Sequence, residues 1–188
     1  MKNLKLLAFI AFTAITVTSC SDDDTSSAPV NEEEVITTVT ATFTPAGGGT
    51  AITVTSRDLD GDGPDAPVVT ASGNFAAGTT YSGAVTFLNE LATPADNITA
   101  EILEEGEDHQ IFFQQNGLGT FTYTDTDANN HPIGLGFRYV ANNAPATGSL
   151  IVTLRHLPNK SATGVAGGNI ANAGGGTDAE VVFPVVVQ

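Results

Sequence analysis

The chain has 188 residues, of which 21 are acidic and six are basic, so its formal net charge is −15 at pH 7 with histidine neutral. A charge of this sign and size repels nucleic acid and anionic lipid surfaces, and we exclude both as partners. Frequent glycine, abundant threonine and valine, and the absence of long helical periodicity favour an all-β domain.

Residues 1–19 have the pattern of a signal peptide. Two lysines, Lys2 and Lys5, precede an apolar run over residues 6–17, which is shorter than the roughly 20 residues that a spanning helix needs. Val17, two small residues and the only cysteine, Cys20, then follow. An incidental cysteine after a plain signal peptide is the alternative, but it would leave a reactive thiol in an exported chain.

The order of an aliphatic residue, two small residues and Cys20 resembles the bacterial lipobox. The resemblance implies that the thiol carries a diacylglycerol and that this lipid holds the protein on a membrane. Ser21, Asp22, Asp23 and Asp24 resemble the acidic tag of surface-exposed lipoproteins of the Bacteroidota. We therefore expect a protein anchored in the outer membrane that faces the medium, with residues 20–34 as a disordered acidic tether.

Residues 35–188 are expected to form a single domain of eight or nine strands. Alternating β-branched and aromatic residues bounded by turn residues predict them at 35–43, 50–56, 67–75, 80–88, 109–115, 120–124, 132–139, 149–156 and 180–187. A glycine-rich loop over residues 158–178 is expected to pack partly on a sheet edge. This pattern predicts an antiparallel two-sheet sandwich of immunoglobulin-like character with one short helix.

The one predicted helix begins after Thr93, which is expected to be its N-cap, with Pro94 at the first helical position. Ile98, Ile102 and Leu103 would form its apolar stripe, and Gly106 would end it.

The order of segments along the mature chain resembles that of small flavobacterial lipoproteins; the resemblance covers EEEVITTVT, RDLDGDGPDAPVV, YSGAVTFLNE, EDHQIFF, YTDTDANNHPIGL, VTLRHLPNKSATG and NAGGGTDAEVVFPVVV. Some of those proteins carry the label of a type 1 periplasmic binding fold. Proteins with that fold are longer and alternate strands with helices, so neither the length nor the pattern of this chain fits it. The resemblance implies location and carries no activity to particular residues.

A calcium site is predicted in the acidic loop after the second strand. Asp58, Asp60, Asp62 and Asp65 offer hard oxygen ligands at alternate positions, and glycines allow a tight turn. An EF-hand is excluded, because Val69 stands where the bidentate glutamate would be and no helix flanks the loop. An acidic connection without an ion is the alternative. Residues 125–130 repeat the pattern more weakly and also suit an ordinary hairpin.

A second metal site, for zinc or a similar ion, is predicted from Glu105, Asp108, His109 and His156. Nothing in the spacing brings the two histidines together, and a solvated acidic face beside a structural histidine is the alternative. No catalytic motif is present, so we expect a non-enzymatic protein. We expect it to bind a ligand or to act as an accessory to a TonB-type transporter; the alternative is a calcium-stabilised structural or adhesive surface module.

Overall fold

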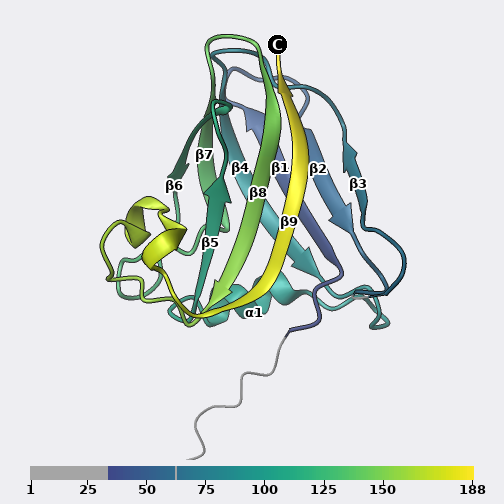
Figure 1. Ribbon diagram of the computed structural model, residues 1–188, viewed down its shortest axis with the longest axis vertical. Helices are drawn as coiled ribbons and strands as arrows, with labels where there is room; N and C mark the ends of the chain where they lie inside the picture. Colours follow the sequence, from purple (N-terminus) through teal and green to yellow (C-terminus); the bar gives the residue numbers. More distant parts are fainter. Residues whose placement is uncertain (1–33, 62) are drawn as a thin grey trace, which may run out of the picture. The chain divides into compact units, whose positions relative to one another are not determined.

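The computed structural model describes residues 34–61 and 63–188. The predicted signal peptide, Cys20, the acidic tag at Ser21–Asp24 and Asp62 lie outside the described residues. Within the described residues, nine strands form two antiparallel sheets that face each other (Figure 1), in the orders β3-β2-β1-β4-β7-β6 and β5-β8-β9. Within the described part of the chain, no helix has the length and apolar character needed to cross a membrane.

The larger sheet contains β1 (Thr38–Pro45), β2 (Ile52–Arg57), β3 (Val68–Ala71), β4 (Thr80–Leu88), β6 (Gly119–Tyr123) and β7 (Gly136–Ala141). The smaller sheet contains β5 (His109–Gln114), β8 (Ala146–His156) and β9 (Gly176–Val187). The predicted antiparallel sandwich with one short helix is confirmed. The strand ends differ from expectation: β3 stops at Ala71, while β9 begins four residues before the expected start at residue 180.

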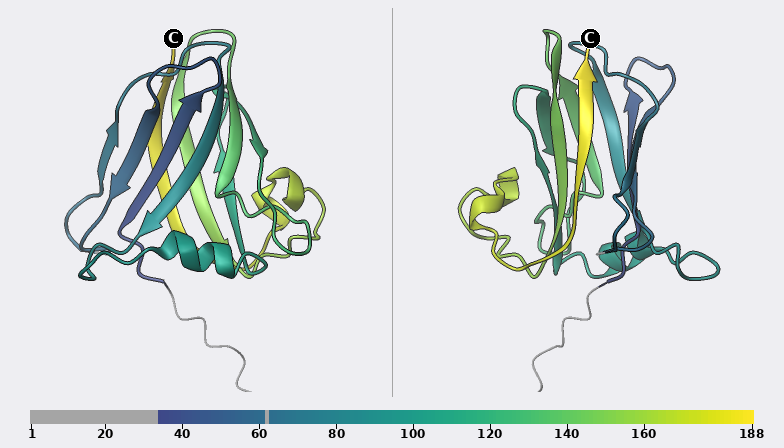
Figure 2. Two further views of the ribbon diagram at one scale, coloured as in Figure 1. Left: turned by 180° about the vertical axis from the view of Figure 1, so that it is seen from behind. Right: turned by 45° about the vertical axis from the view of Figure 1, so that its right-hand side comes forward.

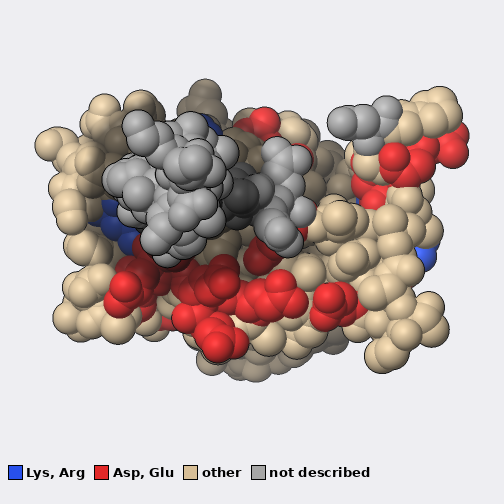
Figure 3. All heavy atoms as spheres, turned by 90° about the horizontal axis from the view of Figure 1, so that it is seen from below, with Lys and Arg blue, Asp and Glu red and all other residues tan. Residues whose placement is uncertain are grey.

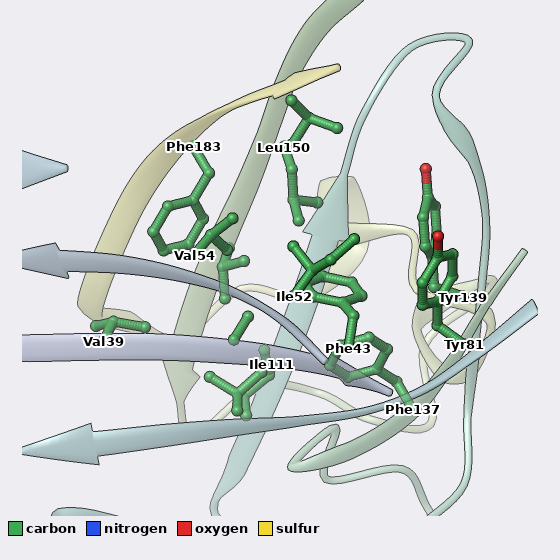
Figure 4. Close-up of a cluster of buried hydrophobic side chains, with 14 of the residues drawn as sticks. Val39, Phe43, Ile52, Val54, Tyr81, Ile111, Phe137, Tyr139, Leu150 and Phe183 are labelled. Carbon is green, nitrogen blue, oxygen red and sulfur yellow. The ribbon is translucent and has the colours of Figure 1, made fainter. Parts of the chain in front are cut away.

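The core lies between the two sheets and consists of inward-pointing side chains from strands of both, among them Val39, Phe43 and Phe183 (Figure 4). Phe43 is its centre, and its ring meets those of Phe75 and Phe137 edge-on, with centroids 4.8 and 5.1 Å apart. Gly83 lies opposite Phe137 in the sheet, and a Cβ there would come within 2.1 Å of that ring. The packing of Phe137 therefore requires glycine at position 83.

Helix α1 (Ile98–Glu104) closes one end of the sandwich and begins later than predicted. Asn97 precedes it, and the prediction of Thr93 as N-cap and Pro94 as the first helical residue is wrong. Asn89 and Asp96 exchange two backbone hydrogen bonds, which hold the intervening residues in a closed turn outside the helix. Of the expected apolar stripe, Ile98 and Ile102 are buried, whereas Leu103 is 60% exposed.

The loop between β8 and β9 covers the outer face of β5 (Figure 1). Its two short 3-10 turns, η1 (Val165–Gly167) and η2 (Ile170–Asn172), bring Val165 and the following Ala173 against Phe112. Gln110 reaches across from β5 and donates to the carbonyl of Val165 at 2.8 Å. The loop therefore adds a small apolar layer outside the sandwich, on an edge strand of the smaller sheet.

Candidate metal centre

The two histidines that the sequence left unconnected are direct neighbours in the smaller sheet. His109 begins β5 and His156 ends β8, and the antiparallel register places them opposite each other. Both follow the inward alternation of their strands, with Ile111 and Leu154 two residues away. Their rings stack with centroids 4.9 Å apart and planes within 7°. Strand pairing thus builds an imidazole pair at the end of the sandwich that α1 closes.

A β-bulge adds Asp178 to this pair. Leu154 pairs with Ala179 and Arg155 pairs with Thr177, so Asp178 is the extra residue of β9 at this shift of register. In an unbroken ladder the side chain at 178 would point outward, but a bulge re-aims it. The side chain is 3% exposed, and its Oδ2 lies 3.7 Å from Nε2 of His109.

Helix α1 fixes the tautomer of His109. The backbone carbonyl of Glu105, the residue after the helix, lies 3.1 Å from Nδ1 of His109. A carbonyl can only accept, so Nδ1 carries the proton, and Nε2 of the neutral ring, 3.7 Å from Oδ2 of Asp178, carries the lone pair. Metal-binding histidines are oriented in this way, with the other ring nitrogen donating to a carbonyl.

Burial lowers the pKa of His109 below its ordinary value, and the charge of a protonated His156 would lower it further. The hydrogen bond to Glu105 and the charge of Asp178 act in the opposite direction with smaller effect. The imidazole is therefore neutral at pH 7, and its contact with Asp178 is not an ion pair there. A neutral imidazole is the form that binds metals.

Glu34, which the sequence assigned to the tether, has a half-buried side chain beside the histidines. Its Oε2 is buried and makes no hydrogen bond within the described residues. The pKa of Glu34 is raised to about 7, and burial is the largest cause. Three carboxylates add to the shift, those of Glu101, Asp178 and Glu105. The charges acting on Glu34 are thus all negative, and a cation would relieve them.

Two overlapping ligand sets result. His109, His156 and Asp178 bring one ligand atom each to within 4.8 Å of one another, and so do Glu34, Glu105 and His109. Ligand atoms on a tetrahedral zinc lie about 3.3 Å apart, given bond lengths of about 2.0 Å. The 3.7 Å between His109 and Asp178 needs only a small side-chain movement to reach that spacing. Two imidazoles with carboxylates suit zinc or a similar transition metal better than calcium, which takes only oxygens.

Of the residues predicted for this site, His109, His156 and Glu105 come together. The side chain of Asp108 is exposed and belongs to neither ligand set within the described part of the chain; its backbone carbonyl accepts from Leu157 at 2.6 Å. Sequence reasoning missed Glu34 and Asp178. Position alone could have suggested Glu34, which immediately precedes the first predicted strand, but no sequence signal announces the bulge that turns Asp178 inward.

The acidic loop after β2 is a compact turn. Asp58 Oδ1 accepts from the backbone N–H groups of Asp60 and Gly61, at 3.3 and 3.0 Å, and Asp60 Oδ2 accepts from Asp65 at 3.1 Å. These bonds are those of an ordinary acidic turn. Among the described residues, none of these aspartates joins a ligand set. Calcium binding by this loop stays a prediction, and Asp62 lies outside the described residues.

The weaker acidic motif, at Asp125 and Asp127, serves the fold. Asp125 accepts from the backbone N–H groups of Gly134 and Gly136, both at 2.8 Å. Asp127 Oδ2 pairs with buried Lys160 at 2.9 Å, and Lys160 also donates to the carbonyl of Gly106. These contacts tie together three loops, and the carboxylates are fully engaged.

Acidic side chains gather at the end of the molecule that carries α1 (Figure 3). Exposed members there include Glu101, Glu104, Glu107 and Asp108. Such a field attracts cations toward the candidate centre.

Comparison of the chain with protein-family models, with curated proteins and with solved structures finds no match in any of the three.

Proposed function

We propose that this protein is a lipid-anchored metal-binding protein of the outer membrane. It holds a divalent transition metal of the zinc type at His109, His156 and Asp178, with Glu34 beside them. The observation that carries the proposal is the convergence of one ligand atom each from His109, His156 and Asp178 to within 4.8 Å of one another. Two imidazoles and a carboxylate oxygen that meet in a largely buried place are a donor set that a transition metal of the zinc type takes.

The chemistry is binding, with no reaction attached. The neutral imidazoles supply nitrogen ligands that carry no charge, and Asp178 supplies negative charge that offsets part of the charge of the ion. Glu34 and Glu105 lie close enough to take part as further ligands or to guide the ion inward. A protein that captures metal at a cell surface and passes it to a TonB-type transporter would use such a site. The lipobox at Cys20 and the tag at Ser21–Asp24 support that location, as sequence patterns.

Titration calorimetry with Zn²⁺ tests the proposed centre, on the mature chain from residue 20 with Cys20→Ser to keep it free of lipid. We expect one zinc per chain, bound more weakly as the pH falls because protons compete for the ligands. His109→Ala should weaken binding by about a hundredfold or more, since even second-shell changes cost about 10–100-fold.

His131→Ala is the matched control, because His131 is the third histidine of the chain and belongs to neither ligand set. It should bind zinc as the parent does. Equal affinity in the parent and His109→Ala proteins would refute the site. Titration with Ca²⁺ checks the other prediction: calcium binding that is lost on Asp58→Ala and kept in His109→Ala would place a separate ion in the loop after β2.

The anchor has its own test. Metabolic labelling with a palmitate probe should tag the wild-type protein and leave Cys20→Ser untagged. A wild-type protein without label, or a Cys20→Ser protein that stays with the membrane fraction unchanged, would remove the lipid from the proposal.

A further inference from the structure

β9, an edge strand of the smaller sheet, lies close to β2 and to the edge strand β3 of the larger sheet (Figure 2, right). Beyond the end of β3, the backbone of Phe75 is hydrogen-bonded to that of Val186 and Gln188 at the end of β9. On the same side, residues of all three strands line a groove of about 780 Å³. Its volume falls in the range of about 300–1,000 Å³ that is usual for small-molecule sites.

Aliphatic side chains line part of the groove. Val69 of β3 and Val35 have side chains that are 37% and 53% exposed, and partly buried Val181 of β9 also lines the groove. Val182 and Glu180 border it from the other face of β9. Aliphatic side chains left in water offer area that an apolar ligand would cover.

The charged side chains that line the groove are all acidic. Glu34, Asp58 and Asp178 lie where β9 begins and β2 ends, Glu180 lies two residues further along β9, and no described lysine or arginine is among the lining residues. Arg57, next to Asp58, is bound instead to Glu90, with Nε and Nη2 at 2.9 and 2.7 Å from the same carboxylate oxygen. The groove therefore combines exposed aliphatic side chains with an acidic lining that is electrostatically suited to a positive charge.

We propose that this groove binds an organic cation with an apolar body, of the alkylammonium class. The ammonium group lies beside Glu34, Asp58 and Asp178, and the hydrocarbon lies along Val69 and Val181. This site is distinct in ligand class from the metal centre and does not depend on it. The two share Glu34 and Asp178, so a bound metal and a bound ammonium compete.

The test uses three probes with one chain length and different head groups: octylammonium, 1-octanol and octanoate. Each is titrated into the mature Cys20→Ser protein in EDTA, so that no metal takes part. We expect octylammonium to bind at least about tenfold more tightly than octanol, since tenfold corresponds to only 1.4 kcal/mol of charge attraction. Octanoate should not bind, and zinc added in excess of EDTA should displace octylammonium.

Val69→Lys places a positive charge inside the groove at an exposed position and should weaken octylammonium binding by about tenfold or more. Val68→Lys is the matched control, because Val68 is the adjacent residue of β3, is 64% exposed and does not line the groove. Val35→Lys, at a lining position that is 53% exposed, repeats the test if Val69→Lys does not fold.

Equal binding of octanoate or octanol, absence of octylammonium binding, or equal loss in Val68→Lys would each overturn the proposal. None of these results bears on the metal centre, which is judged separately by zinc binding to His109→Ala.

Discussion

Two groups of buried polar side chains near the α1 end of the sandwich show opposite treatments of charge. Asp127 accepts from the backbone N–H groups of Asn129 and His131, both at 2.9 Å, and from Lys160 at 2.9 Å. In the other group, a carboxylate oxygen of Asp178 faces a neutral imidazole, and Glu34 is surrounded by negative charge.

The two groups differ in the charges that act on their carboxylates. Burial alone would raise the pKa of Asp127, but the hydrogen bonds from Lys160, His131 and Asn129 outweigh it, and the pKa lies below its ordinary value. That carboxylate is charged and paired with a lysine. The charges that act on Glu34 are those of three carboxylates and raise its pKa. The first group holds loops in place, whereas the second has the donor types of the proposed cation site.

The largest expected effect comes from breaking the balanced group. Lys160→Met leaves the Asp127 carboxylate buried without its counter-charge, and we expect a loss of about 3–5 kcal/mol in the free energy of unfolding, measured with urea. Adding Asp127→Asn should restore part of it, because the amide oxygen still accepts the two backbone bonds without a charge. A loss well below 1 kcal/mol for Lys160→Met would show that the pair does not hold the loops in place.

Zinc bound at the other group should stabilise the folded protein by a slightly smaller amount. At a free concentration of 100 times its dissociation constant, zinc is expected to add about 2.7 kcal/mol to the free energy of unfolding. Urea unfolding with and without zinc measures this, and EDTA should reverse it. His131→Ala should keep the gain and His109→Ala should lose it; an equal gain in His109→Ala would place the ion elsewhere.

Glu34→Gln should have a smaller, pH-dependent effect on the metal-free protein. The pKa of Glu34 is about 7 in the fold against 4.5 ordinarily, so between these values the folded state holds a proton that the unfolded state has released. The contribution of Glu34 to stability therefore falls as the pH rises from 4.5 through 7.

At pH 8 the glutamine variant should thus be more stable than the parent, by less than about 1 kcal/mol because the group is partly screened by solvent. At pH 4 the two proteins should match. Urea unfolding in EDTA at both pH values measures the difference. The lowered pKa of His109 is common to both proteins, so its effect on stability cancels in the difference. A glutamine variant that is less stable than the parent at pH 8 would contradict the repulsion seen at Glu34.

The smallest effect is expected at the exposed pair of Arg57 and Glu90. The side-chain hydrogen bonds from Arg57, and then from Thr38, lower the pKa of Glu90 to about 2. Solvent and salt screen such a pair, so Arg57→Gln should leave the urea midpoint at pH 7 nearly unchanged. A shift of the urea midpoint as large as that in Lys160→Met would mean that solvent exposure does not explain why the two ion pairs differ in their contribution to stability.

The sequence predicted the sheets well because strand signals are local. Alternation in residues 35–43 and 80–88 marks which side chains turn inward, and Val39, Phe43 and Phe87 are buried accordingly. The predicted start of α1 was wrong because it depends on a pairing between residues that no local signal shows. Thr93 and Pro94 have the local chemistry of a helix start, but the pairing of Asn89 with Asp96 takes them into a turn.

The site was predictable only in part. His109 and His156 could be named as ligand types, but their meeting depends on the register between β5 and β8, which packing sets across 47 positions of the chain. Asp178 reaches them through a bulge, and Glu34 through the path of the chain into β1. No short sequence motif predicts the bulge or the path of the chain into β1, because both depend on how distant segments meet.

A crystal structure of the zinc-loaded protein, with anomalous diffraction measured on both sides of the zinc absorption edge, tests the metal centre most directly. We expect one anomalous peak bonded to Nε2 of His109 and to Asp178, with His156 in the same coordination sphere. A peak only in the loop after β2, or no peak between β5, β8 and β9 in crystals that bind zinc in solution, would contradict it.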